Sequence, residues 1–103
     1  MHPPDGEPVW HSAETRFAPD HPTAAGHFPG RPVLPAAVLL DQALRLIGGE
    51  AALEVRTAKF LRAVRPGDHV AFRWQQRADG TIMFECWLSD KGGLAVTGWL
   101  RPA

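Results

Sequence analysis

The sequence predicts an α+β fold in which a curved antiparallel sheet wraps around one long, buried central helix. The first observation is an uninterrupted run over about residues 35–48 that is apolar over nearly the whole helical circumference. The second is a series of downstream segments in which apolar and polar residues alternate. A helix that is apolar almost all round must be covered by protein. Alternating segments supply a sheet with one apolar face to cover it.

The predicted helix has clear ends and a narrow polar strip. Pro35 suits its start, because proline is tolerated in the first turn of a helix, and Gly48-Gly49 end it. Only Asp41, Gln42 and Arg45 are polar between these points. The run is too short to cross a bilayer, so the cover must be protein.

The predicted strands are separated by turn sequences. Alternation or strand-forming composition marks residues 54–64, 70–75, 82–88 and 94–100, and a further strand is expected at residues 9–17. Arg65-Pro66-Gly67-Asp68 has the proline and glycine that a type II turn prefers, and Ala78-Asp79-Gly80 is typical of a hairpin turn. Short turns between successive strands favour an antiparallel sheet.

The length of 103 residues suits one domain. Residues 1–8 contain three prolines and one glycine and predict a flexible arm, which leaves residues 9–103 as the domain. Residues 18–35 contain five prolines and predict an ordered loop. A domain of this size buries only a moderate share of its surface, so a deep, dry pocket is easier to build between two copies.

Composition narrows the function classes. Lys+Arg and Asp+Glu balance at 11 each, so the whole chain has no electrostatic attraction to nucleic acid or a membrane surface. We expect no membrane insertion, no signal peptide and a cytoplasmic location. No Cys/His spacing typical of a metal site is present, and neither a metal nor a cofactor is expected. The single Cys86 cannot form an intramolecular disulfide; a core residue is the favoured interpretation, and a reactive thiol is the alternative.

The segment GHFPGRPVLPAAVLLD, which contains His27 and Asp41, is the candidate for chemistry. An imidazole titrates near neutrality and can accept a proton, although a histidine that merely caps a loop is the alternative. A carboxylate within an apolar helix is costly unless it is paired or functional. Asp41 is therefore either an acid or the partner of Arg45, which follows one helical turn later.

His27-Phe28-Pro29-Gly30, Pro32-Val33-Leu34-Pro35 and Asp41 resemble the active-site segment of 3-hydroxyacyl-[acyl-carrier-protein] dehydratases of the FabA/FabZ type. The downstream Lys59-Phe60, with Val64 and Pro66-Gly67-Asp68, resembles the strand-and-turn pattern of the same family. Residues 20–26 resemble short relatives from aryl polyene or polyketide-like lipid pathways. The resemblance covers roughly residues 15–100 and implies the hotdog fold.

The resemblance also implies roles for individual residues. His27 would be the base and Asp41 the acid, the backbone N–H of Ala36 would contact the thioester carbonyl, and the carbonyl of Val33 would orient His27. The chain has Ala36 where the family usually has glycine, which adds a methyl group near the thioester. It has Arg45 where related enzymes often have glutamine, and a guanidinium there would favour the carboxylate form of Asp41.

The remaining expectations concern substrate and partners. Candidate tunnel residues are Phe28, Leu34, Leu39, Phe60 and Phe72, with plain core packing as the alternative. Candidate carrier-protein docking residues are Arg31, Lys59, Arg62 and Arg65, with scattered solvated charges as the alternative. The resemblance implies a homodimer, or a higher oligomer built from it, with active sites shared across the interface. The expected substrate is the acyl-phosphopantetheine group of acyl carrier protein.

The function that follows is a hydro-lyase. It would convert a 3-hydroxyacyl thioester to a trans-2-enoyl thioester in fatty-acid or polyketide-like biosynthesis. The alternatives are a hotdog acyl-thioesterase and a catalytically weak module that binds acyl groups or a carrier protein. Because Ala36 and Arg45 depart from the family pattern, the binding module remains an alternative.

Overall fold

The computed structural model describes residues 9–18, 33–89 and 92–103. In chain order its elements are β1 (His11–Arg16), α1 (Ala36–Gly48), β2 (Leu53–Phe60), β3 (His69–Gln76), β4 (Ile82–Leu88) and β5 (Gly93–Pro102). The predicted arm at residues 1–8 and residues 19–32 of the predicted loop lie outside the described residues. Among the described residues, no helix is long and apolar enough to cross a membrane.

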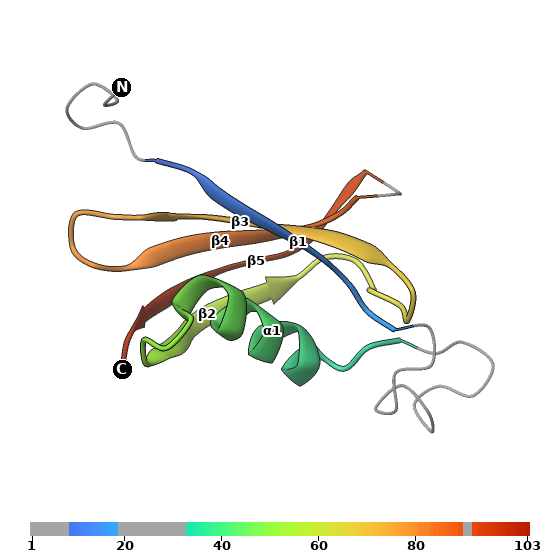
Figure 1. Cartoon of the computed structure of the whole chain (residues 1–103), viewed down its shortest axis with the longest axis horizontal. Coiled ribbons are helices and arrows are strands. Elements are labelled where there is room, and N and C mark those ends of the chain that lie inside the picture. The colour runs from blue at the N-terminus through green and yellow to red at the C-terminus, as the bar shows by residue number, and fades with distance from the viewer. Residues whose placement is uncertain (1–8, 19–32, 90–91) are drawn as a thin grey trace.

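The strands form one antiparallel sheet in the order β1-β3-β4-β5-β2. Figure 1 shows α1 on one side of this sheet, next to β2. The prediction of an α+β fold with a single helix against an antiparallel sheet is therefore confirmed. The strands β1 and β2 form the two edges of the sheet in this chain.

The core lies between α1 and the inward face of the sheet. In β4 the buried residues alternate strictly, and Phe84 and Cys86 are fully buried. Cys86 is opposite Phe72 on β3 and Val96 on β5, so three adjacent strands contribute to one apolar layer. Leu39 of α1 belongs to the same buried cluster. The period-two alternation of the sequence therefore produced the inward face as predicted.

The strand predicted at residues 54–64 ends earlier, at Phe60. The N–H groups of Leu61 and Arg62 both donate to the carbonyl of Ala95, so the regular ladder with β5 stops there. Val64 turns toward the start of the helix instead, and its carbonyl accepts from the N–H of Leu34 at 2.8 Å. The prediction was wrong for residues 61–64 because a tertiary contact, not the local pattern, decides where the strand ends.

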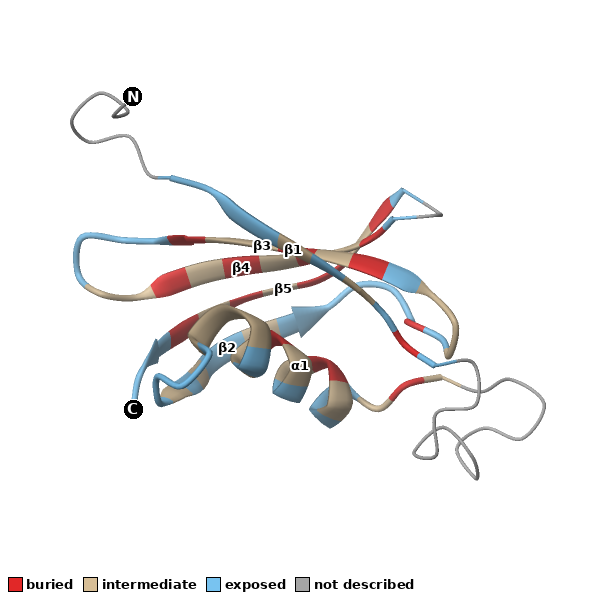
Figure 2. Cartoon of the chain, in the orientation of Figure 1, coloured by how far each residue is buried: buried red, intermediate tan, exposed pale blue. Residues whose placement is uncertain are grey.

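The helix has the predicted position but is less buried in the single chain than the sequence predicts. Leu39 and Ala43 are buried, whereas Ala36 and Ala37 are exposed. Five further aliphatic residues are half-buried: Val38, Leu40, Leu44, Leu46 and Ile47. Figure 2 shows the helix buried toward the sheet and exposed on its outer side. One sheet covers only one side of a helix, so the expectation of a fully enclosed helix does not hold within one chain.

Candidate active site

Asp41 lies on the side of α1 that faces away from the sheet. Its Oδ2 accepts an ion-pair contact from Nε of Arg45 at 2.9 Å, one helical turn later. The side chains of Asp41 and Arg45 are 60% and 75% exposed. The pairing that the sequence left as an alternative is thus present, on an open surface. Exposed pairs of this kind contribute little to stability, and an exposed carboxylate carries little desolvation cost within the single chain.

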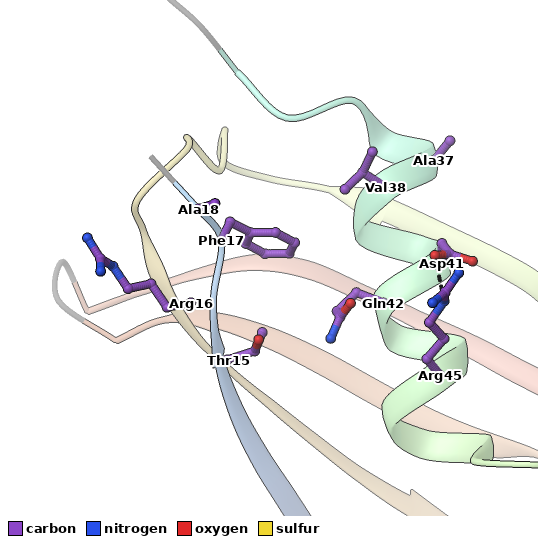
Figure 3. Close-up of a pocket in the computed structure, with 9 residues that line it drawn as sticks. All are labelled: Thr15, Arg16, Phe17, Ala18, Ala37, Val38, Asp41, Gln42 and Arg45. Carbon is purple, nitrogen blue, oxygen red and sulfur yellow. Dashed lines mark ion pairs between the residues drawn. The ribbon is translucent and has the colours of Figure 1, made fainter. Parts of the chain in front are cut away.

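A cavity of about 570 Å³ lies between the end of β1 and α1, and Asp41 is one of its lining residues. Its lining residues are Thr15, Arg16, Phe17, Ala18, Ala37, Val38, Asp41, Gln42 and Arg45. Figure 3 shows Gln42 and Val38 pointing toward β1, with the Asp41–Arg45 pair on the outer side of the helix. The cavity is therefore open next to Asp41, and a second surface is needed to enclose the carboxylate.

The β1 side of this cavity was missed by the sequence reasoning. Phe17 is buried, with 6% of its surface exposed, and its ring points toward α1 in Figure 3. Nothing in the pattern of residues 9–17 distinguishes this phenylalanine from an ordinary strand residue. Gln42 was noticed only as a polar neighbour of Asp41, yet it points into the space between the two elements.

The start of α1 presents backbone N–H groups beside the same cavity. Pro35 occupies the position before the helix with φ −60° and ψ 149°, and it makes no side-chain capping hydrogen bond. The N–H groups of Val38 and Leu39 donate to the carbonyl of Pro35. The first N–H groups of a helix have no acceptor within the helix. In α1 these are the N–H groups of Ala36 and Ala37, which precede Val38 in the chain. The positive end of the helix dipole lies at the same point.

Three of the candidate tunnel residues lie together. Leu34, Leu39 and Phe60 line a cavity of about 310 Å³, to which Val33, Leu61, Arg62, Ala63 and Val64 also contribute. Phe60 and Leu61 are 44% and 46% exposed, so the cavity opens at an apolar rim. Phe72 is 1% exposed and belongs to the core cluster under the sheet rather than to this lining. The sequence does not single out Leu61 and Ala63, because the pattern at residues 54–64 predicts a strand through them.

Two of the candidate docking arginines share a neighbouring cavity. Arg62 and Arg65 line about 440 Å³ together with Ala63, Leu88, Gly92 and Gly93. Arg62 also lines the apolar cavity, so it stands where the apolar and cationic surfaces meet. Lys59 precedes Phe60 in β2 and therefore points to the opposite face of the sheet. The structure does not bring Lys59 together with the two arginines.

Gly93 leaves room for the side chain of Arg62. A Cβ atom built on Gly93 would lie 2.5 Å from Nε and 2.7 Å from Cδ of Arg62. The arginine side chain therefore rests directly on the backbone of β5, in space that any other residue at position 93 would occupy. Arg62 and Gly93 thus both line this cavity, with the arginine side chain exposed to solvent.

Three predicted site residues, His27, Phe28 and Arg31, lie outside the described residues. Val33 is half-buried and lies two residues before the position that precedes the helix. Cys86 is fully buried in the core, and burial raises the pKa of its thiol to about 12. A thiol with that pKa stays protonated at neutral pH, which fits its interpretation as a core residue.

Comparison with known proteins identifies the family. The chain matches the family model described as ApeI-like, ApeI dehydratase, over residues 6–99. It is 34% identical over 82 residues to the 3-hydroxyacyl-[acyl-carrier-protein] dehydratase FabZ of Lactiplantibacillus plantarum. That match covers 64% of this chain and 56% of the relative, so the chain spans little more than half of the curated protein that it matches.

Solved structures agree on the fold. The dehydratase heterocomplex ApeI:P from Xenorhabdus doucetiae superposes with a TM-score of 0.69 at 19% identity, with 92% of this chain and 96% of that chain covered. The (R)-hydratase from A. caviae involved in PHA biosynthesis superposes with a TM-score of 0.65 at 20% identity, with coverages of 93% and 96%. The match of the family model over almost the whole length, together with this hotdog fold, shows that the chain belongs to the ApeI-like dehydratase family.

Proposed function

We propose that this chain dehydrates a 3-hydroxyacyl thioester to a trans-2-enoyl thioester and water. The observation that supports this most directly is the position of Asp41, which borders an open cavity beside the start of the helix in a member of a dehydratase family. Elimination needs a base at C2, an acid for the departing hydroxyl and donors for the carbonyl oxygen in between. The first N–H groups of α1 would be the donors and Asp41 the acid, and Ala37 and Asp41 line the same cavity.

The proposed steps conserve atoms and charge. His27 takes the proton from C2, and the electron pair left there forms the double bond as the C3–O bond breaks. Asp41 gives its proton to the leaving hydroxyl, which departs as water. The N–H of Ala36 donates to the thioester oxygen while negative charge builds up there. The carbonyl of Val33 accepts from the other ring nitrogen of His27 and selects its tautomer.

The proposed substrate is carried on acyl carrier protein. An acyl-phosphopantetheine arm has an apolar end and a phosphate end. The apolar cavity lined by Leu34, Leu39 and Phe60 shares Arg62 and Ala63 with the cationic cavity, which Arg65 also lines. The two surfaces therefore follow each other in the order that such an arm requires, and guanidinium groups suit both a phosphate and an acidic carrier.

A turnover assay tests the proposed function. The protein is given a 3-hydroxyacyl group on acyl carrier protein, and enoyl product and free thiol are followed separately, with His27→Ala in parallel. We expect enoyl formation that falls by about 10²- to 10⁴-fold in His27→Ala, the usual contribution of a general base. Thiol release without enoyl product would identify a thioesterase. Binding without turnover would identify a carrier-binding module, and undiminished turnover by His27→Ala would refute the mechanism.

We further propose that the active form is a homodimer. The outer side of α1 leaves Ala36 and Ala37 exposed and Leu40, Leu44 and Ile47 only half-buried, and a second chain would cover this surface and enclose Asp41. The expected result in sedimentation or light scattering is a dimeric mass, or a multiple of it, at assay concentrations. A monomeric mass in an active preparation would contradict this proposal. Activity that appears only after a different dehydratase chain is added would replace the homodimer by a heterocomplex, the assembly named for the Xenorhabdus protein.

A further inference from the structure

The connection between β2 and β3 contacts both sides of the cavity beside Asp41. On the β1 side, the N–H of Gly67 donates to the carbonyl of Phe17 at 2.8 Å, and the N–H of Phe17 donates to the carbonyl of Asp68 at 3.2 Å. Nε of Arg16 also donates to the carbonyl of Gly67 at 3.4 Å. Arg16 and Phe17 both line the cavity, so the turn extends the β1–β3 pairing to the residues of this wall.

The same connection holds the helix side. The carbonyl of Val64 accepts from the N–H of Leu34 at 2.8 Å, two residues before the helix begins at Ala36. Val64 is 1% exposed and belongs to the core, so this acceptor is itself fixed. Ala37 and Val38 of the first helical turn line the cavity opposite Phe17. Val64–Asp68, which we call the clamp, thus connects the end of β1 to the residues just before α1.

Asp68 closes the clamp. Its Oδ2 accepts from the N–H of Arg65 at 2.9 Å, and its own N–H donates to the carbonyl of Arg65 at 3.0 Å. Gly67 has a φ of 90°, in the left-handed region that favours glycine, which lets the turn present its N–H to Phe17. Removal of the Asp68 carboxylate would therefore loosen the turn that carries the contacts to β1.

We propose that the clamp, closed by Asp68, is a positioning element of the active site: it sets the separation between the β1 wall and the start of α1, where Ala36 and Asp41 act. This rests on the proposed function for its kinetic consequence, but the clamp itself is tested independently of turnover. Because misplacement of catalytic groups by about 1 Å can cost on the order of 10²-fold in rate, loosening the clamp should lower kcat more than it raises KM.

The chain supplies a matched control at the opposite end of β3. In the β3–β4 turn, Asp79 accepts from the N–H of Thr81 at 2.9 Å and from its hydroxyl at 2.6 Å, and Gly80 has a φ of 88°. These hydrogen bonds lower the pKa of the Asp79 carboxyl. Asp79 lines neither the cavity beside Asp41 nor the apolar and cationic cavities. Asp68→Ala and Asp79→Ala therefore each remove an aspartate that closes a glycine-containing turn, at two different places.

We expect Asp68→Ala to lower kcat for enoyl formation by about 10- to 100-fold with KM within about twofold of the wild type. Asp68→Asn, whose amide oxygen still accepts from Arg65, should recover most of the rate. Asp79→Ala should lower the melting temperature by about as many degrees as Asp68→Ala does, because each variant removes the carboxylate that closes a turn. Asp79→Ala should leave kcat unchanged. Equal loss of kcat in Asp68→Ala and Asp79→Ala, or full kcat in Asp68→Ala, would overturn the proposal.

Amide hydrogen exchange tests the clamp even if the assay finds no dehydration, in which case only the proposed function fails. The N–H groups of Phe17 and Leu34 should exchange faster in Asp68→Ala but not in Asp79→Ala. If Asp68→Ala does not fold, amide hydrogen exchange of the wild-type protein tests the clamp instead. The hydrogen bonds of the Phe17, Leu34 and Gly67 N–H groups should then open together as one unit. Independent exchange of the Phe17 and Leu34 N–H groups would contradict the proposed clamp.

Discussion

Replacement of Asp41 by asparagine is expected to lower kcat for dehydration by about 10²- to 10⁴-fold, the range typical of a general acid. Asparagine keeps the size of the side chain, but it can neither give a proton to the leaving hydroxyl nor carry the negative charge that pairs with Arg45. Stability should hardly change, because the lost ion pair with Arg45 is exposed and such pairs contribute about 0–1 kcal/mol. Steady-state kinetics and denaturant unfolding of the same preparation measure the two effects separately.

Glu54→Gln is the matched control. Glu54 on β2 forms an ion pair with Arg101 on β5, and the two side chains are 46% and 56% exposed. This variant removes the same carboxylate charge from a comparable surface pair, at a place that borders none of the three cavities of the proposed active site. We expect unchanged kcat. Full activity in Asp41→Asn, or equal losses in the two variants, would remove Asp41 from the mechanism.

Arg45→Gln separates the two explanations for Asp41. If Asp41 serves only as the partner of Arg45, loss of the arginine should reproduce the effects of Asp41→Asn. If Asp41 is the acid, Arg45→Gln should retain turnover, because the carboxyl group is still present and no longer held against a guanidinium. Glutamine forms helices almost as well as arginine, so the variant should fold normally.

The elements of this fold were predictable because their signals are local. Alternation in residues 82–88 placed Phe84 and Cys86 on one face, and both are fully buried in β4. The turns at Gly67 and Gly80 followed from proline, aspartate and glycine in the positions that such turns require, and both glycines have φ near 90°. The helix followed from a run without breakers, ended by glycine.

The site was only partly predictable because its walls depend on long-range contacts. Asp41 stood out as a polar residue in an apolar run, and Leu34, Leu39 and Phe60 do line one cavity. Phe17 did not stand out, since its role depends on hydrogen bonds to Gly67 and Asp68, about fifty residues away. The burial of the helix was overestimated because an apolar surface does not say whether the same chain or another one covers it.

The glycine at position 98 has another role that the sequence did not reveal, and it leads to the largest expected effect on stability. A Cβ atom at Gly98 would lie 2.5 Å from the backbone carbonyl oxygen of Thr57 and 2.7 Å from Cε1 of Phe84. Thr57 belongs to the neighbouring strand, and the ring of Phe84 is fully buried. We expect Gly98→Ala to lower the free energy of unfolding by about 3 kcal/mol, the upper range for overpacking a core, as measured by denaturant unfolding.

Gly48→Ala tests whether backbone contact, rather than crowding as such, causes this loss. A Cβ atom at Gly48 would lie 2.8 Å from Cδ1 of Leu53, nearly as close as the 2.7 Å to Cε1 of Phe84 at Gly98. That atom, however, is the end of a flexible, half-buried side chain, which can rotate away. Alanine also favours a helix over glycine by about 1 kcal/mol, so we expect Gly48→Ala to be neutral or slightly stabilising.

The difference between Gly98 and Gly48 matters for the site because the carbonyl of Thr57 is part of the backbone of β2. It cannot move without shifting β2 against β5, and β2 leads through Phe60 directly into the apolar cavity and the clamp. Gly98→Ala should therefore lose turnover as well as stability, even at temperatures where it remains folded. If Gly48→Ala proves as destabilising as Gly98→Ala, the strand backbone yields as easily as a leucine side chain, and this explanation of Gly98 is wrong.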